Sequence, residues 1–172
     1  LWMHDQSTTS QFSMNKIKMI VGSSCGLGYV PLMPGTFGAL PGILFYFLLW
    51  TFLPEQYLVY GLLVVIALLI LLTYLLTPWA IEYWKSEDPS EFVLDEVIGF
   101  LCVPVFFPQH DFFQTALYGF ILFRVLDIIK VPPANIVDKN VKGWFGIVFD
   151  DVISAGYAAL VLYTMEYYKI LF

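Results

Sequence analysis

Two long stretches of this sequence contain no charged residue. They cover residues 19–54 and 56–81 and are separated only by Glu55. A membrane-spanning helix needs about 20 predominantly apolar residues, and a charge at the bilayer centre costs roughly 3 kcal/mol or more. The chain of 172 residues is 59% hydrophobic and 13% charged, far from the composition of a soluble domain. The sequence therefore predicts an all-α fold, a compact helical bundle that crosses a membrane several times.

Five apolar segments are candidates for helices of this bundle. Residues 59–76 are nearly all Leu, Ile and Val, and residues 37–53 are the next clearest. Residues 92–107, 112–129 and 147–163 carry charged side chains near one end, so each is either a spanning helix with a functional end or a helix buried in the bundle. We expect four to five apolar helices in one polytopic membrane domain, residues 14–172. Residues 1–13 are mostly polar, and we expect a disordered tail or an expression remnant there.

The lysines predict the orientation in the membrane. The connections at residues 54–56 and 108–111 have no Lys or Arg, whereas lysines precede the first apolar segment and lie in the other two connections. Positive residues collect on the cytoplasmic side. The amino terminus and the two lysine-bearing connections, residues 82–91 and 130–143, are therefore expected in the cytoplasm. Lys169 does not fit a five-span arrangement, and it indicates either that the last helix lies in the membrane interface or that the bundle has only four full crossings. The lysines on the cytoplasmic side are Lys16, Lys18, Lys85, Lys130, Lys139 and Lys142.

Acidic residues collect at the same cytoplasmic ends. Each has an ordinary explanation by itself, because carboxylates stabilise helix N-termini and Asp127, near a helix C-terminus, has Arg124 and Lys130 within pairing distance. Together they supply oxygen ligands without clustered His or Cys, which favours Mg²⁺ or Mn²⁺ over zinc. We therefore predict a metal site and a catalytic site made of the same five carboxylates, Asp95, Glu96, Asp127, Asp150 and Asp151.

The neighbouring cations and glycines indicate a phosphate ligand. Carboxylates that hold Mg²⁺ beside basic side chains are typical of phosphoester hydrolysis by metal-activated water. Lys130 is a predicted catalytic residue, and the predicted substrate contacts are Gly35, Thr36, Arg124 and Lys130. The glycine-rich residues 26–38 could present backbone N–H groups to a head group, or simply form a turn before a helix.

Other classes of protein remain alternatives. A proton- or cation-coupled transporter also uses carboxylates in the membrane, but it predicts acids spread through the bilayer. A structural subunit would leave the five acids without a role. The Cys-x5-Arg and Asp-x-Asp-x-Thr/Val phosphatase motifs are missing, and His4 and His110 are remote from the acids in sequence. A net charge of −6 excludes a general affinity for nucleic acid.

Four ordered motifs resemble those of the phosphatidylglycerophosphatase A family. They are GLGYVPLMPGTFG (26–38), DPSEFVLDEVIG (88–99), FRVLDIIK (123–130) and GIVFDD (146–151), the last followed by Ala155-Gly156. The resemblance implies a Mg²⁺-dependent phosphatase of the bacterial inner membrane that converts phosphatidylglycerophosphate, a phospholipid of the bilayer, to phosphatidylglycerol and phosphate. It also implies that the five carboxylates form the acidic site on the cytoplasmic face and that Lys130 contacts the phosphate.

Overall fold

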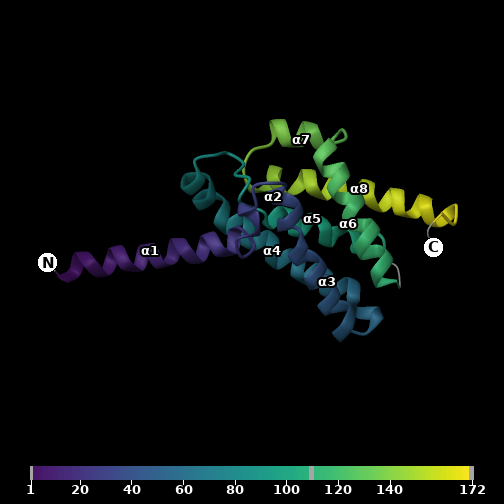
Figure 1. The fold of residues 1–172 in the computed structure, drawn as a ribbon, viewed down its shortest axis with the longest axis horizontal. Helices are drawn as coiled ribbons and strands as arrows, with labels where there is room; N and C mark the ends of the chain where they lie inside the picture. The colour runs from purple at the N-terminus through teal and green to yellow at the C-terminus, as the bar shows by residue number, and fades with distance from the viewer. Residues whose placement is uncertain (1, 109–110, 171–172) are drawn as a thin grey trace.

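The computed structural model describes residues 2–108 and 111–170, and within these ranges it contains eight α-helices, one short 3-10 helix and no strand (Figure 1). The prediction of an all-α fold is therefore confirmed. In chain order the elements are α1 (Trp2–Gly22), η1 (Leu27–Tyr29), α2 (Pro34–Gly38), α3 (Leu40–Phe52), α4 (Glu55–Trp84), α5 (Leu94–Phe106), α6 (Phe112–Ile129), α7 (Ala134–Asn140) and α8 (Trp144–Tyr167).

Four helical segments of the described chain are long and apolar enough to cross a membrane. They are residues 34–52, which combine α2 and α3, and the helices α4, α6 and α8. Their exposed surface is rich in large apolar side chains, such as Leu68 on α4 and Leu160 on α8. Such a surface fits contact with lipid. The prediction of four to five apolar helices is confirmed, and four helical segments have the length of a membrane span.

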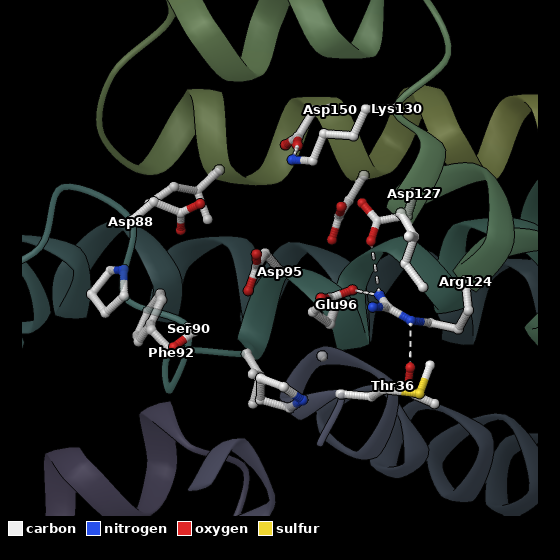
Figure 2. Close-up of a pocket in the computed structure, with 18 residues that line it drawn as sticks. Thr36, Asp88, Ser90, Phe92, Asp95, Glu96, Arg124, Asp127, Lys130 and Asp150 are labelled. Carbon is white, nitrogen blue, oxygen red and sulfur yellow. Dashed lines mark hydrogen bonds and ion pairs between the residues drawn. The ribbon is translucent and has the colours of Figure 1, made fainter. Parts of the chain in front are cut away.

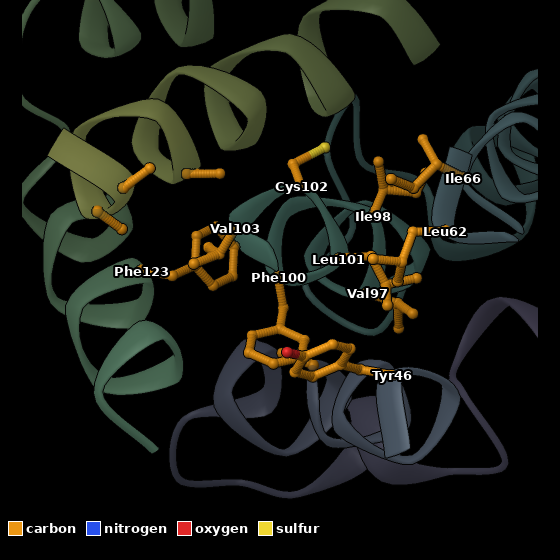
Figure 3. Close-up of a cluster of buried hydrophobic side chains, with 14 of the residues drawn as sticks. Tyr46, Leu62, Ile66, Val97, Ile98, Phe100, Leu101, Cys102, Val103 and Phe123 are labelled. Carbon is orange, nitrogen blue, oxygen red and sulfur yellow. The ribbon is translucent and has the colours of Figure 1, made fainter. Parts of the chain in front are cut away.

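The segment 92–107 forms the buried centre of the bundle. Its helix α5 has only 13 residues and packs against α3, α4, α6 and α8. Ile98, Phe100, Leu101 and Val103 are fully buried (Figure 3). A helix that is apolar on all sides is one that is surrounded by protein or lipid, and here neighbouring helices surround it. Of the two roles expected for this segment, the structure therefore favours the buried helix.

Small side chains let α8 approach α5 closely. Ala155, Ala158 and Ala159 of α8 are buried in the core, and small residues allow two helix backbones to come near each other. A Cβ at Gly99 of α5 would lie 2.5 Å from Cζ of Phe123 on α6 and 2.9 Å from Cβ of Asp151 on α8. Close packing around α5 brings the starts of α5 and α8 and the end of α6 to one end of the bundle.

The amino-terminal segment is helical. Residues 2–13, for which we expected a disordered tail or an expression remnant, form the first part of helix α1, which extends away from the bundle (Figure 1). The later part of α1 lies against α4, where Trp79 Nε1 donates a hydrogen bond of 3.0 Å to Asn15 Oδ1. A helix that projects from a bundle needs no apolar stripe. Residues 2–13 therefore lack the periodic apolar positions by which a helix is predicted. Whether the domain begins at residue 14 stays a prediction.

Candidate active site

A cavity of about 420 Å³ lies where α5 and α8 begin and α6 ends (Figure 2). Its lining comes from α2, the connection before α5, the first turn of α5, the last turn of α6 and the first half of α8. The structure brings every predicted catalytic, metal and substrate residue to this one cavity, although they come from four separate segments. These residues are Gly35, Thr36, Asp95, Glu96, Arg124, Asp127, Lys130, Asp150 and Asp151.

Three carboxylates from three helices form the centre of the site. Glu96 on α5, Asp127 on α6 and Asp151 on α8 each have a carboxylate oxygen within 4.8 Å of the other two. Asp127 and Asp151 are buried. Like charges at this separation in a buried site repel one another strongly, so the arrangement needs a compensating positive charge.

Three acidic side chains that line the site each have a buried oxygen without a hydrogen-bond partner among the described residues. These oxygens are Asp95 Oδ1, Asp150 Oδ1 and Asp151 Oδ2. A buried polar atom without a partner is costly, and a native one needs a specific explanation. Carboxylate oxygens are hard ligands, and no His or Cys lines the described cavity. The residues therefore fit a hard divalent cation such as Mg²⁺.

Arg124 connects three elements of the site. It is buried on α6, and its Nη1 pairs with Glu96 Oε2 on α5 and lies 3.1 Å from Asp127 Oδ2. Its Nε donates a hydrogen bond of 3.3 Å to Thr36 Oγ1 on α2 (Figure 2). Asp127, near the unfavourable C-terminal end of a helix, thus has the partner that its position requires. Arg124 supplies part of the positive charge and also fixes two of the carboxylates.

Gly35 leaves room for the Glu96 carboxylate. A Cβ at this position would lie 1.9 Å from Glu96 Oε1 and 2.7 Å from Arg124 Nη2, and real Cβ atoms do not come this close to a neighbour. The sequence suggested that Gly35 contacts a substrate through its backbone. The structure adds a steric reason for glycine, because any side chain here would displace Glu96.

Lys130 lies at the opposite side of the cavity. It ends α6 with a left-handed backbone conformation, φ 51°, and its Nζ pairs with Asp138 at 2.7 Å and with Asp150 at 2.5 Å. Burial opposes the charge of the ammonium group, but the hydrogen bonds from these two carboxylates outweigh it and raise the pKa of Lys130 above its usual range. Lys130 therefore remains a cation at every physiological pH.

Two acidic residues near the site were not among the predicted site residues. Asp88 lines the cavity, and Asp138 on α7 binds Lys130. Asp88 begins the motif of residues 88–99, so the sequence contained a signal that could have placed it at the site. Asp138 has no local signal, because only the fold of α7 brings it beside the end of α6.

An exposed ion pair joins the two connections beside the cavity. Lys142 Nζ lies 2.6 Å from Glu87 Oε2. The hydrogen bond between the two side chains lowers the pKa of Glu87 and raises that of Lys142. Both side chains are solvated, so water and salt screen the pair. Glu87 is therefore a suitable position for a control substitution outside the cavity.

Similarity to known proteins covers all the segments that line the cavity. The sequence model of the family described as "Phosphatidylglycerophosphatase A" matches residues 20–166. The chain is 34% identical over 160 residues to "Phosphatidylglycerophosphatase A" of Escherichia coli K12, covering 93% of this chain and 90% of that protein. It is 31% identical over 145 residues to the protein of the same name from Haemophilus influenzae Rd, covering 84% of this chain and 86% of that one.

A relative from Bacteroides thetaiotaomicron has another name. It is named "Putative phosphatidylinositol-3-phosphatase" and is 31% identical over 150 residues, covering 85% of this chain and 91% of that protein. No solved structure matches the chain. All three relatives are named as phosphatases of phosphorylated lipids.

Proposed function

The chain belongs to the phosphatidylglycerophosphatase A family, and from this premise we propose that it hydrolyses the terminal phosphate monoester of phosphatidylglycerophosphate to phosphatidylglycerol and inorganic phosphate. The chain is a phosphoric monoester hydrolase. The observation that carries the proposed substrate is the cavity of five acids at one end of a bundle that contains four membrane-length helical segments, within the segment that the family model matches.

We propose Mg²⁺ as the cofactor. Asp95, Glu96, Asp127, Asp150 and Asp151 would hold it, and the three unpartnered oxygens among them support this assignment. Mg²⁺ bound there would supply Lewis-acid charge to the phosphate oxygens and activate a water molecule for attack on phosphorus.

The chain's own residues supply the remaining requirements of the reaction. Hydrolysis forms a bond from water oxygen to phosphorus, breaks the bond from phosphorus to the glycerol oxygen, and moves one proton from water to the leaving alcohol. Asp95 or Asp150 can accept the proton from water if it does not itself hold the cation, because each has an oxygen without a hydrogen-bond partner. Lys130, fixed as a cation beside Asp150, can neutralise phosphate oxygens as charge develops. A covalent intermediate on one of the carboxylates is the alternative route.

We place the site at the cytoplasmic face of the bacterial inner membrane. Lys130 lines the cavity, and Lys142 lies in the connection beside it, whereas the α3–α4 turn at Pro54 has no cation nearby in sequence. The positive-inside rule puts the lysine-bearing end in the cytoplasm. Trp79, Tyr83 and Trp84 form an aromatic cluster at the end of α4, and such residues hold a helix at the depth of the lipid head groups.

The transporter alternative has less support from the arrangement of the acids. A relay for protons or cations needs carboxylates at successive depths, whereas the five acids of this chain line one cavity at one end of the bundle. The name of the Bacteroides relative favours a second candidate substrate, a 3-phosphorylated phosphoinositide. Both lipids carry a phosphate monoester on a polar head group.

Phosphate release from defined lipids tests the proposal. The purified chain in detergent micelles with Mg²⁺ should release phosphate from phosphatidylglycerophosphate faster than from phosphatidylinositol 3-phosphate or from glycerol 3-phosphate. Asp127→Asn is the inactive reference. Faster release from the inositol lipid would support the second candidate, equal release from soluble glycerol 3-phosphate would remove the lipid specificity, and no release from any of the three would refute the proposed function.

A further inference from the structure

One part of the cavity rim is apolar and exposed. Met33 and Ile128 both line the cavity, yet 55% of Met33 and 59% of Ile128 is accessible from outside. Each is close in sequence to a site residue, since Met33 lies two positions before Gly35 and Ile128 follows Asp127. Met33 also has a left-handed backbone, φ 64°, a conformation that is uncommon for a residue other than glycine. The rim therefore connects the acidic cavity directly to the membrane-facing surface.

Helix α6 divides into a face for the site and a face for lipid. Phe123, Arg124 and Asp127 are buried, whereas Ile121, Val125 and Ile128 are exposed. The three exposed residues are spaced by four and three positions and so lie along one side of the helix. They form an apolar stripe that begins at the cavity rim and continues along α6 into its membrane-spanning part.

A second apolar stripe begins at Met33. Phe37, Leu40 and Leu44 are exposed and follow Met33, which precedes the first residue of α2. They are spaced from one another by three and four positions, which places them on one side of the segment formed by α2 and α3. This stripe also starts at the cavity rim and continues along a candidate membrane span. Two lipid-facing stripes thus lead to one opening.

Side-chain contacts join the two spans at both ends. Near the cavity, Arg124 of α6 donates its hydrogen bond to Thr36 of α2. At the far end, the ring of Phe112 on α6 lies 5.1 Å from that of Tyr46 and 5.4 Å from that of Trp50 on α3. We call the line between these contacts the α3–α6 seam. Its two sides are held together, and residues from both sides at one end of it line the cavity.

We infer that the α3–α6 seam binds an acyl chain of the lipid substrate, and that the head group reaches the acids laterally between Met33 and Ile128. This inference rests on the proposed function, because it requires a substrate whose phosphate is joined to hydrocarbon. A lipid whose phosphate lies in the cavity beside Lys130 must keep its hydrocarbon chains in the bilayer, and the apolar rim is the exposed apolar part of the lining. Other parts of the lining, such as Asp88, Ser90 and Lys130, are polar or charged and would oppose a hydrocarbon chain.

Substitutions at the rim separate recognition of the acyl chain from catalysis. Met33→Asn and Ile128→Asn place an amide at the rim without touching the carboxylates, and Asn tolerates the left-handed backbone of Met33. Leu68→Asn on α4 is the matched control, because Leu68 is 61% exposed and does not line the cavity. We expect kcat/KM for dioleoyl phosphatidylglycerophosphate to fall roughly three- to tenfold in each rim variant, with unchanged kcat/KM for the deacylated head group. Equal falls for both substrates, or no fall, would overturn the inference.

Photolabelling gives a second readout that does not depend on turnover or on the variants. A phosphonate analogue of phosphatidylglycerophosphate, with a diazirine on its acyl chain, is irradiated with the wild-type protein in vesicles. We expect labelling of residues 33–44 and 121–128 in excess of that from diazirine phosphatidylcholine, and loss of this excess on adding unlabelled phosphonate. A pattern identical to that of phosphatidylcholine refutes the acyl-chain site alone. Lack of phosphate release from the parent lipid by the wild type refutes the proposed function instead.

Discussion

Arg124 Nη1 and Asp127 Oδ2 lie 3.1 Å apart at the end of α6, and both side chains are about nine-tenths buried. The same nitrogen also pairs with Glu96 of α5. The buried guanidinium group of Arg124 therefore holds Glu96 and Asp127. These are two of the three carboxylates whose oxygens lie within 4.8 Å of one another, the third being Asp151. This relationship makes the acid cluster dependent on a single arginine.

Removing the Arg124 charge should cost both stability and activity. Arg124→Gln leaves two buried carboxylates without their partner, and breaking a buried pair in this way costs about 3–5 kcal/mol. Arg124→Lys keeps the charge but cannot reach Glu96, Asp127 and Thr36 with one planar group, so we expect an intermediate effect. Thermal unfolding in detergent and phosphate release are the measurements. A lysine variant equal to the wild type in both would show that the three-way contact is not needed.

Neutralising the acids should abolish turnover without preventing assembly. We expect Asp95→Asn, Glu96→Gln, Asp127→Asn and Asp151→Asn each to reduce kcat at least about 100-fold, because each removes a proposed cation ligand. The proteins should still insert into the membrane, since removing a charge relieves repulsion among the acids. Glu87→Gln is the matched control, because Glu87 is exposed and lies outside the cavity lining. Near-normal rates in two or more of the four variants would contradict the site assignment.

A methyl group at Gly35 should disturb the site through Glu96. The Cβ of Gly35→Ala would fall 1.9 Å from Glu96 Oε1, so the carboxylate or the start of α2 must move. A small displacement of a catalytic group lowers the rate by about 100-fold, and we expect a loss of that order in kcat. Gly156→Ala on α8 is the control, because its Cβ would have no neighbour within 4 Å among the described atoms. Equal activity of the two variants would exclude the steric role of Gly35.

Mg²⁺ should stabilise the folded protein as well as support turnover. A ligand that binds only the native state raises Tm with its concentration, and a cation among these acids also relieves their repulsion. We expect EDTA to abolish phosphate release and Mg²⁺ to raise Tm in the wild type, with a much smaller rise in Asp151→Asn. The Tm shift is measured without substrate and so reports binding separately from activity. No Tm shift in the wild type would argue against a metal at the acids.

The orientation can be tested with single cysteines in a chain whose Cys25 and Cys102 are replaced. We expect a cysteine at Lys85 or Lys139 to be protected from an impermeant thiol reagent in intact cells, because the lysine-rich connections belong on the cytoplasmic side. A cysteine at Gln56, in the first turn of α4, should react. Labelling of the Lys139 position from outside would place the active site on the opposite face.

The sequence alone indicated a membrane environment and predicted residues that the fold brings to one cavity. Uncharged segments of membrane length can only be helices in lipid or in a protein core, and residues 56–81 are such a segment. The acids were found by their position near the ends of three other apolar segments, residues 92–107, 112–129 and 147–163, where a charge needs a reason. All five line the cavity in the folded chain.

Tertiary structure decided what a local pattern does not contain. An apolar run such as residues 92–107 has the same composition whether lipid or protein surrounds it, and only the packing of four helices around α5 distinguishes the two. The partners of the charges also depend on contacts between distant segments. Thr36 and Arg124 are 88 positions apart, and Lys130 meets Asp138 only because α7 folds back toward α6. Local sequence fixes helix formation and burial preference, whereas these pairings arise from long-range packing.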